Sequence, residues 1–210
     1  MIAMILAAGR GERMRPLTDE KPKPLLEICK KPLIEWHLEK LSRAGFKKVV
    51  INIAHLGDMI PEALGDGSKW NMQIIYSDEQ KTGALESAGG IINALEYLSE
   101  EFLVLNADVW CDYEFNHDYK LDDKYAHLVL VPNPEHNIDG DFEYDGSKYT
   151  FSGIGYYSKK MFEKQSCEKS ALAPILRENI ENNKISFELY KGEWRDIGTP
   201  QRLEEVNAGS

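Results

Sequence analysis

The chain has 210 residues, of which 42% are hydrophobic and 29% charged, a composition that fits a single globular domain with a sizeable core and excludes a disordered or fibrous protein. A formal net charge of −10 excludes general attraction to nucleic acid, so basic residues are expected to act locally. The apolar opening at residues 2–8 is too short to span a membrane, and no basic segment of a signal peptide precedes it. We therefore expect a cytoplasmic protein with no nucleic-acid or membrane partner. Its three scattered cysteines are expected to stay reduced and to form neither a disulfide framework nor a zinc site.

The first half of the chain alternates apolar runs with segments of helical period. Continuous apolar runs, typical of parallel strands covered on both faces, predict strands at residues 2–8, 49–53, 73–76 and 102–105. Segments of helical period predict helices at 57–64 and 89–98, and a longer one that begins at Pro32 and stops at Gly45. This alternation predicts βαβ units around a mostly parallel sheet.

The second half has a different pattern. Asp145 and Gly146 form a hairpin-turn signal between aromatic, alternating segments within residues 142–157, which favours antiparallel pairing. The other elements are predicted as a strand at 128–131, a helix at 172–182, a strand at 185–190 and a last helix that opens at Thr199 and Pro200. The predicted fold is therefore α/β, a Rossmann-like three-layer sandwich with a mixed, mostly parallel sheet.

A loop rich in glycine and arginine follows the first predicted strand. Gly9 and Gly11 lie among three arginines within residues 9–15. Glycine lets backbone N–H groups approach an anion closely, and arginine adds charge-assisted contacts, so the loop is suited to holding phosphates. It is neither a P-loop nor a dinucleotide-binding fingerprint, whose third glycine would be Met14 here. A plain surface turn is the alternative.

A second basic segment lies close behind, where Pro22 and Pro24 flank Lys23. The two prolines stiffen the backbone, so the lysine can meet a phosphate at a smaller ordering cost. A solvated basic loop is the alternative interpretation of this segment.

Together, these two segments resemble the signature of the sugar-1-phosphate nucleotidyltransferases, enzymes that join a nucleoside triphosphate to a sugar 1-phosphate. The resemblance extends over nearly the whole chain, through AAGRGERMRPLT at 7–18, KPKPL at 21–25, LGDGSKW at 64–70, LESAGG at 85–90, Asn-Ala-Asp at 106–108 and WRDIGTP at 194–200. It implies one domain over residues 1–210, with a nucleotide-binding half at about 1–110 and a sugar-phosphate-binding half at about 111–210. We expect no β-helix acyltransferase domain of the kind that some relatives append.

The resemblance also assigns roles to the residues of the first half. It implies a nucleotide site formed by Ala8, Gly9, Gly11, Glu12, Arg13, Lys23 and Gly89. Arg13 and Lys23 are the expected catalytic cations, with Arg13 at the triphosphate and Lys23 near the α-phosphate. Gly89 belongs to a turn that contacts the nucleobase in relatives, and Glu86 replaces the first glycine that many relatives have there.

Two aspartates are candidates for holding Mg²⁺. Asp108 follows a predicted buried strand, where ligands of open parallel sheets bind, and Asp196 lies just before the last predicted helix. Mg²⁺ prefers oxygen ligands and retains waters and substrate phosphates, so two carboxylates can suffice. By the residues alone, Asp108 could simply end a strand and Asp196 precede a turn. The resemblance implies that both are catalytic metal ligands.

The sugar 1-phosphate is expected in the second half. The resemblance implies that Asn106, Asp141, Ser152 and Gly153 bind it, because the segments around the last three are similar to those of uridylyltransferases that act on N-acetylmuramate 1-phosphate in cell-wall recycling. An Asp-rich turn and a tight glycine crossing are the plain alternatives. The expected reaction is transfer from UTP to this sugar 1-phosphate with Mg²⁺, an in-line displacement that needs no side-chain nucleophile.

Other interpretations stay open. Another hexose or heptose 1-phosphate with UTP, GTP or dTTP would keep the chemistry, whereas a catalytically silent nucleotide-sugar sensor, or a plain interaction module, would keep the fold alone. The full set of Arg13, Lys23, Asp108 and Asp196 favours an enzyme. The five histidines are interpreted as structural or solvated, and both a monomer and a small homo-oligomer are compatible with the sequence.

Overall fold

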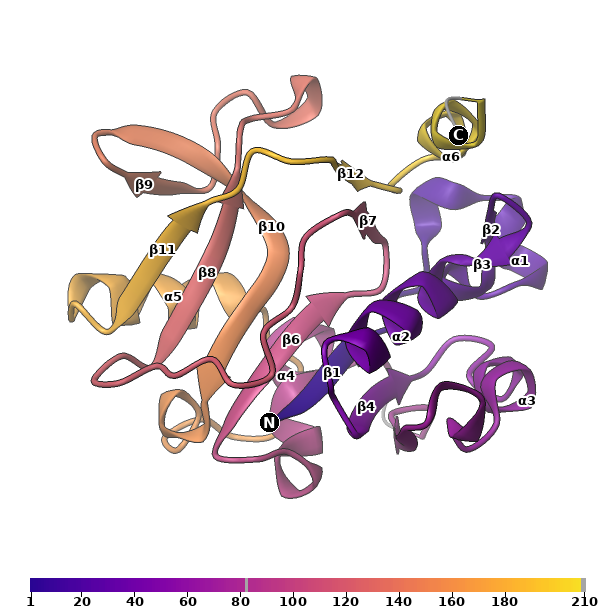
Figure 1. Cartoon of the computed structure of the whole chain (residues 1–210), viewed down its shortest axis with the longest axis horizontal. Helices are drawn as coiled ribbons and strands as arrows, with labels where there is room; N and C mark the ends of the chain where they lie inside the picture. The colour runs from indigo at the N-terminus through magenta and orange to yellow at the C-terminus, as the bar shows by residue number, and fades with distance from the viewer. Residues whose placement is uncertain (82, 209–210) are drawn as a thin grey trace.

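A mixed β-sheet runs through the molecule and joins its two halves (Figure 1). The computed structural model describes residues 1–81 and 83–208. The strands of the sheet are β1 (Ile2–Leu6), β4 (Lys48–Ile53), β5 (Gln73–Asp78), β6 (Glu101–Asn106), β8 (Ala126–Val131), β9 (Phe142–Tyr144), β10 (Ser147–Ser158) and β11 (Ile185–Leu189). Two short antiparallel pairs lie outside it, β2 (Glu27–Ile28) with β3 (Lys31–Pro32) and β7 (Val109–Cys111) with β12 (Trp194–Asp196). The α-helices are α1 (Leu17–Glu20), α2 (Leu33–Arg43), α3 (Met59–Leu64), α4 (Glu86–Ala94), α5 (Leu172–Glu181) and α6 (Pro200–Ala208).

The order of the strands brings the carboxyl ends of the central ones together. Over the described residues the order is β11-β8-β10-β6-β1-β4-β5, with β9 paired to β10. β6, β1, β4 and β5 are parallel neighbours, whereas β10 runs antiparallel to both β6 and β8. Leu6 at the end of β1 pairs with Asn106 at the end of β6, so both strands stop at the edge where α/β proteins bind ligands. The predicted mixed, mostly parallel sheet is confirmed.

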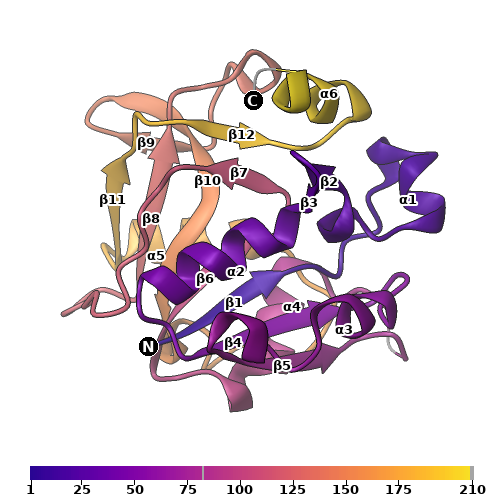
Figure 2. The same ribbon diagram turned by 45° about the vertical axis from the view of Figure 1, so that its right-hand side comes forward.

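Helices cover both faces of this sheet (Figures 1 and 2). Successive residues of a strand point to opposite faces, so Ala3 and Ile5 of β1 lie in the apolar core shared with α2 and α3, and Met4 lies in the core shared with α4 and α5. Removal of apolar surface from water on both faces is the main force that holds these layers together. The predicted three-layer sandwich is confirmed.

The last helix returns to the loop region that follows β1. Met14 and Leu33 form a third apolar cluster with Leu203 and Val206 of α6. The side chain of Asn207 accepts a hydrogen bond from the Cys29 backbone N–H at 2.8 Å, and Figure 2 shows α6 beside β2. The C-terminal helix therefore holds the basic N-terminal loops in place from outside the sheet.

The predicted turn signals hold in the structure. Asp145 and Gly146 separate β9 from β10 and have φ values of 51° and 75°, as a two-residue type I′ hairpin requires. Gly45 has a φ of 93° just after α2. The Thr199 hydroxyl accepts a hydrogen bond from the Arg202 backbone N–H at 3.4 Å, the predicted cap of α6.

Two features differ from the prediction. The helix predicted at 89–98 begins at Glu86 and ends at Ala94, where a 3-10 turn follows it. The carboxylate of Glu79, the residue after β5, accepts a hydrogen bond from the Leu85 backbone N–H at 2.8 Å and fixes the start of the helix. The pair β7 and β12 was not predicted. Each strand has three residues, too few for a periodic signal, and the partners lie far apart in the chain.

Among the described residues, no helix combines the length and apolar character needed to cross a bilayer. Cys29, Cys111 and Cys167 are free thiols, Cys111 buried and the other two exposed.

Candidate active site

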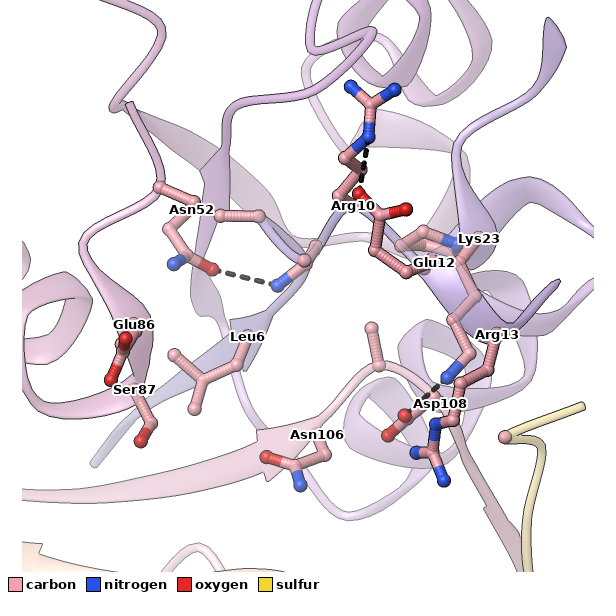
Figure 3. Close-up of a pocket in the computed structure, with 18 of the residues that line it drawn as sticks. Leu6, Arg10, Glu12, Arg13, Lys23, Asn52, Glu86, Ser87, Asn106 and Asp108 are labelled. Carbon is pink, nitrogen blue, oxygen red and sulfur yellow. Dashed lines mark hydrogen bonds and ion pairs between the residues drawn. The ribbon is translucent and has the colours of Figure 1, made fainter. Parts of the chain in front are cut away.

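A cavity of about 480 Å³ opens at the carboxyl ends of β1 and β6 (Figure 3). The loop after β1, the start of α4 and the end of β6 form its walls. Of the residues predicted for the nucleotide, catalytic and sugar sites, the ones that line it are Ala8, Gly9, Gly11, Glu12, Arg13, Lys23, Asn106 and Asp108. The fold therefore brings together residues that are separated by up to about 100 positions in the chain.

The glycine loop is held tightly at one glycine and open at the other. Gly11 has a φ of 69°, and a Cβ there would lie 2.9 Å from Cγ2 of Thr18, whose hydroxyl donates to the Gly11 carbonyl at 2.8 Å. A side chain at this position would therefore be both strained and crowded. At Gly9 a Cβ would meet nothing within 4 Å, so this part of the backbone is open to a ligand. Such a loop can present N–H groups to an anion.

Some charged side chains of this loop are ion-paired with one another, and one is not. Glu12 forms ion pairs with Arg10 at 2.7 Å and with Arg15 at 3.4 Å, which compensate its charge within the loop. Arg13 takes part in none of the ion pairs formed by the described residues, and Figure 3 shows its guanidinium beside Asp108. Arg13 is thus a cation available to an anionic ligand.

Lys23 and Asp108 form an ion pair inside the cavity, with 2.6 Å between Nζ and Oδ2. The lysine side chain is 12% exposed and the aspartate side chain 32%, so both are partly shielded from water while the aspartate still faces the cavity. Lys23 stands between Pro22 and Pro24 and begins the 3-10 turn Lys23–Leu25. The two prolines make this segment rigid, and it places the lysine ammonium group at the end of β6. An ammonium and a carboxylate at one strand end can bind phosphate and a cation side by side.

The pairing of β7 with β12 brings Asp196 next to Asp108. Asp196 pairs with Val109, and the Ile197 backbone N–H donates to the Asp108 carbonyl at 2.8 Å. The Asp196 carboxylate accepts a hydrogen bond from Arg202 and lies 3.0 Å from Nε2 of His136. His136 was expected to be structural or solvated, and its contact with a predicted metal ligand could not be inferred from a loop residue 60 positions away.

The two aspartates fit a magnesium ion by their chemistry. Mg²⁺ binds through one or two carboxylates and keeps waters and substrate phosphates, rather than filling an all-protein cage. In the described part of the chain, no three His, Cys, Asp or Glu side chains come close enough to form such a cage. Asp108 lines the cavity at the ends of β1 and β6, whereas Asp196 lines a separate one together with His136 and Arg202. Gly198 lies between them, and a Cβ there would be 2.8 Å from the Asp196 carboxylate and 3.4 Å from Arg13.

A buried polar network that was not predicted lies behind the glycine loop. The Asn52 side chain accepts a hydrogen bond from the Ala7 backbone N–H at 2.7 Å and donates to the Glu79 carboxylate, also at 2.7 Å. Glu79 in turn accepts from the Leu85 backbone N–H, and its burial raises the pKa of the carboxyl group. The network ties the glycine loop to the start of α4. Asn52 follows an apolar run as an isolated polar residue, which was the available signal.

At the start of α4, Glu86 and Ser87 line the cavity, but Gly89 does not. Gly89 is buried against the crossing segment 168–170, where a Cβ would lie 2.3 Å from the Glu168 carbonyl. Glu86 has a φ of 63°, a conformation that costs a non-glycine residue about 1 kcal/mol or more.

The residues predicted for the sugar 1-phosphate separate into two groups. Asn106, Asp141 and Gly153 line a second cavity of about 250 Å³, and Asn106 also lines the first. A Cβ at Gly153 would lie 2.7 Å from the Asn106 amide, so glycine is required where β10 bulges over this side chain. Ser152 is buried in the bulge, where its hydroxyl accepts from the Ile154 backbone N–H at 3.1 Å, and it lines neither cavity.

The open α/β sheet, with a glycine–arginine loop and an acidic strand end at one edge, defines a nucleotide-binding protein of the Rossmann-like class. Comparison with known proteins gives the family. Residues 2–140 match the nucleotidyl transferase family, and the chain belongs to this family.

Individual relatives agree with this assignment. The chain is 47% identical to the N-acetylmuramate alpha-1-phosphate uridylyltransferase of Neisseria meningitidis serogroup B, over 99% of this chain and 97% of that protein. It is 30% identical to the mannose-1-phosphate guanylyltransferase catalytic subunit beta of Danio rerio, over 96% of this chain and 62% of that protein. A Bacillus anthracis crystal structure described as a glucose-1-phosphate thymidylyltransferase superimposes with a TM-score of 0.84 at 20% identity, covering 99% of this chain and 94% of the other. The sequence-based recognition of a sugar-1-phosphate nucleotidyltransferase is confirmed.

Proposed function

We propose that the protein transfers a uridylyl group from UTP to N-acetylmuramate 1-phosphate, which yields UDP-N-acetylmuramate and pyrophosphate. The observation that carries the proposal is the pair of adjoining cavities, because Leu6, Ser87 and Asn106 line both and the Lys23–Asp108 ion pair lies at the end of the first. Two substrates can thus lie side by side across one strand end. Identity of 47% over nearly the whole length to a uridylyltransferase for this sugar phosphate supports the choice of substrates.

The proposed chemistry is an in-line displacement. A phosphate oxygen of the sugar 1-phosphate forms a bond to the α-phosphorus of UTP, and the bond from that phosphorus to the bridging oxygen of the β-phosphate breaks, so pyrophosphate leaves. The work of the protein is to position two anions and to stabilise the charge of the transition state. No side chain has to form a covalent intermediate.

The residues of the first cavity divide this work. The open backbone at Ala8 and Gly9, the turn at Gly11 and the guanidinium of Arg13 hold the triphosphate. Lys23 neutralises charge at the α-phosphate. Asp108 and Asp196 would hold Mg²⁺, which when bound neutralises phosphate charge and orients the two substrates.

On the sugar side, Asn106, Asp141 and Gly153 line the second cavity and provide polar contacts for the ring. The buried Ser152 supports the bulge that places Gly153 there. On this proposal the protein acts in the cytoplasm, where UTP is available, and its product belongs to peptidoglycan recycling.

The test is pyrophosphate release by the purified full chain with Mg²⁺, across four nucleoside triphosphates and a panel of sugar 1-phosphates. The highest kcat/KM is expected for UTP with N-acetylmuramate 1-phosphate, and a chelator should abolish it. The Asp108→Asn variant serves as the control that release originates at this site. A different preferred pair would overturn the choice of substrates, and silence with every pair despite UTP binding would favour a nucleotide-sugar sensor.

A further inference from the structure

The second cavity has walls unlike those of the first. It is lined largely by apolar and aromatic side chains, Leu6, Val104, Phe142, Phe151, Leu172 and Leu176. Two charged side chains face it, Asp141 from the segment before β9 and Arg177 from α5. A mostly apolar cavity with a few placed polar groups is the usual form of a selective small-molecule site.

Helix α5 presents Arg177 to this cavity through its helical period. Leu172 and Leu176 are buried and stand four positions apart, and Ala173 and Arg177 form the next such pair on the same side of the helix. The short side chain of Ala173 leaves room beside the apolar wall. The long side chain of Arg177 ends the row, exposed to solvent and still part of the cavity lining.

Arg177 takes part in none of the ion pairs or side-chain hydrogen bonds formed by the described residues. Asp141, the other charged residue of the cavity, accepts a hydrogen bond from the Phe151 backbone N–H at 2.8 Å and so remains on the side of β10. Arg177 is therefore a cation of this cavity that no carboxylate of the described residues pairs with. A guanidinium has a fixed fork of donors that matches a carboxylate with two parallel hydrogen bonds.

A second polar group without a protein partner lines the same cavity. The Tyr157 side chain is 1% exposed, and its hydroxyl has no hydrogen-bond partner within the described chain. It extends over Gly155, where a Cβ would lie 2.8 Å from the hydroxyl, so the glycine leaves it room. Burial raises the pKa of Tyr157 above its ordinary value, so the hydroxyl stays a donor. Among the described residues this donor is unpaired and shielded from solvent in the free protein, and a ligand oxygen satisfies it only when neighbouring atoms shift.

We infer that the second cavity is a subsite for a carboxylate carried by the sugar, and that Arg177 binds this carboxylate and makes the enzyme select acidic sugar 1-phosphates over neutral ones. The inference rests on the proposed function, because the lactyl ether of N-acetylmuramate ends in such a carboxylate. Its methyl group suits the apolar wall of α5.

The position of Arg177 excludes the sugar's own phosphate as its ligand. That phosphate must reach the α-phosphorus at the Lys23–Asp108 end of the first cavity, and Arg177 lines the second cavity but not the first. The anion at Arg177 is therefore a second one on the same substrate. Asp141 would repel a carboxylate, so it faces the uncharged hydroxyl and amide groups of the ring.

The experiment compares N-acetylmuramate 1-phosphate with N-acetylglucosamine 1-phosphate, which lacks the lactyl ether and is otherwise the same. Pyrophosphate release at saturating UTP gives kcat and KM for wild type, Arg177→Met and Arg177→Lys. Arg43→Met, which removes an exposed arginine from α2, is the matched control. Circular dichroism and UTP titration check that each variant folds and binds nucleotide.

Arg177→Met should raise the KM for N-acetylmuramate 1-phosphate about 10- to 100-fold, the loss expected for a charge-assisted hydrogen bond. Its KM for UTP and its kinetics with N-acetylglucosamine 1-phosphate should stay at wild-type values. Arg177→Lys should restore part of the lost affinity for N-acetylmuramate 1-phosphate, because lysine keeps the positive charge but lacks the two parallel donors of the guanidinium group.

Two results would overturn the inference, and they separate it from the proposed function. If wild type prefers N-acetylmuramate 1-phosphate and Arg177→Met keeps that preference, the subsite is wrong and the proposed function stands. If wild type itself prefers a neutral sugar 1-phosphate, both are wrong.

Discussion

The two adjoining cavities are built by different means. The first is formed by the backbone of a glycine loop and by charges, with Lys23 and Asp108 2.6 Å apart, whereas the second is walled by apolar side chains with Asp141 and Arg177 as its charged groups. Phosphate groups share one shape and charge, so one short loop can hold them. A sugar substituent must be recognised by shape, and that requires walls from several distant elements. The first cavity therefore serves the phosphate chemistry. The second cavity, on the other side of Asn106, serves selectivity for the sugar.

The largest effect is expected from Lys23→Ala, which tests whether charge governs the first cavity. Loss of the ammonium group should lower kcat about 10²- to 10³-fold, as for removal of one preorganised electrostatic stabiliser. The fold should persist, because Lys23 lies in a loop and contributes little to the core. The matched control is Lys21→Ala in the same loop, whose exposed pair with Glu27 should matter little to activity. Pyrophosphate release and a thermal melt measure both, and unfolding of Lys23→Ala would contradict the assignment.

Asn52→Ala tests whether the first cavity depends on the polar network behind its loop. The change deprives the Ala7 backbone N–H of its partner and removes one hydrogen bond to Glu79. We expect a loss of about 2–4 kcal/mol in the free energy of unfolding and weaker UTP binding. Asn93→Ala, on α4, removes one hydrogen bond to Ser77 and a long one, at 3.8 Å, from the Cys167 thiol, and should cost about 1 kcal/mol without changing UTP affinity. Equal losses in urea unfolding of the two variants would argue against the network.

The region behind Asp108 should be sensitive to acid through His37. Burial, followed by the charge of Lys40, lowers the pKa of this histidine from 6.5 to about 4. The histidine therefore binds a proton more readily in the unfolded chain than in the folded one. The contribution of His37 to the free energy of unfolding is complete above about pH 6.5 and is lost as the pH falls toward 4. Between pH 7 and pH 4.5 the wild type should lose about 2–3 kcal/mol from this residue, and His37→Leu should lose that much less. Urea unfolding at the two pH values measures it; identical losses would contradict the assignment.

The smallest effect is expected from Tyr157→Phe in the second cavity. The hydroxyl has no partner in the described chain, so its removal should leave the free energy of unfolding unchanged or slightly higher. The KM for the sugar 1-phosphate should rise about 2- to 10-fold, as for one neutral hydrogen bond. Tyr97→Phe, at an exposed tyrosine, should change neither quantity. A destabilised Tyr157→Phe with unchanged KM would show that the hydroxyl serves the fold instead.

Most functional residues of the first cavity could be predicted from the sequence. Gly9, Gly11, Arg13 and Lys23 lie within 15 consecutive positions, so the motif and the site nearly coincide. Asp108 could be predicted because it directly follows an apolar strand, and strand ends of parallel sheets meet at one edge. The type I′ turn at Asp145 and Gly146 was equally local, since it depends on two adjacent residues.

The second cavity could be predicted only in part. Asp141 and Gly153 were found through their motifs, but Arg177 lies on α5 and Tyr157 on β10, and neither has a local signal that separates it from an ordinary surface or core residue. The contact of His136 with Asp196 was missed for the same reason. Gly89 shows the converse, because its small size serves close packing against Glu168 rather than the cavity wall.

The sequence by itself determined the layers, the mostly parallel sheet and the phosphate-binding chemistry, because hydrophobic period, turn residues and a contiguous glycine loop act over a few positions. The tertiary structure decided which distant groups meet. The three-residue pairing of β7 with β12 places Asp196 beside Asp108, Asn52 joins the glycine loop to Glu79, and α5 presents Arg177 to the second cavity. These contacts arise from the packing of whole elements. Their free energy comes from burial across the sheet, so no short stretch of sequence encodes them.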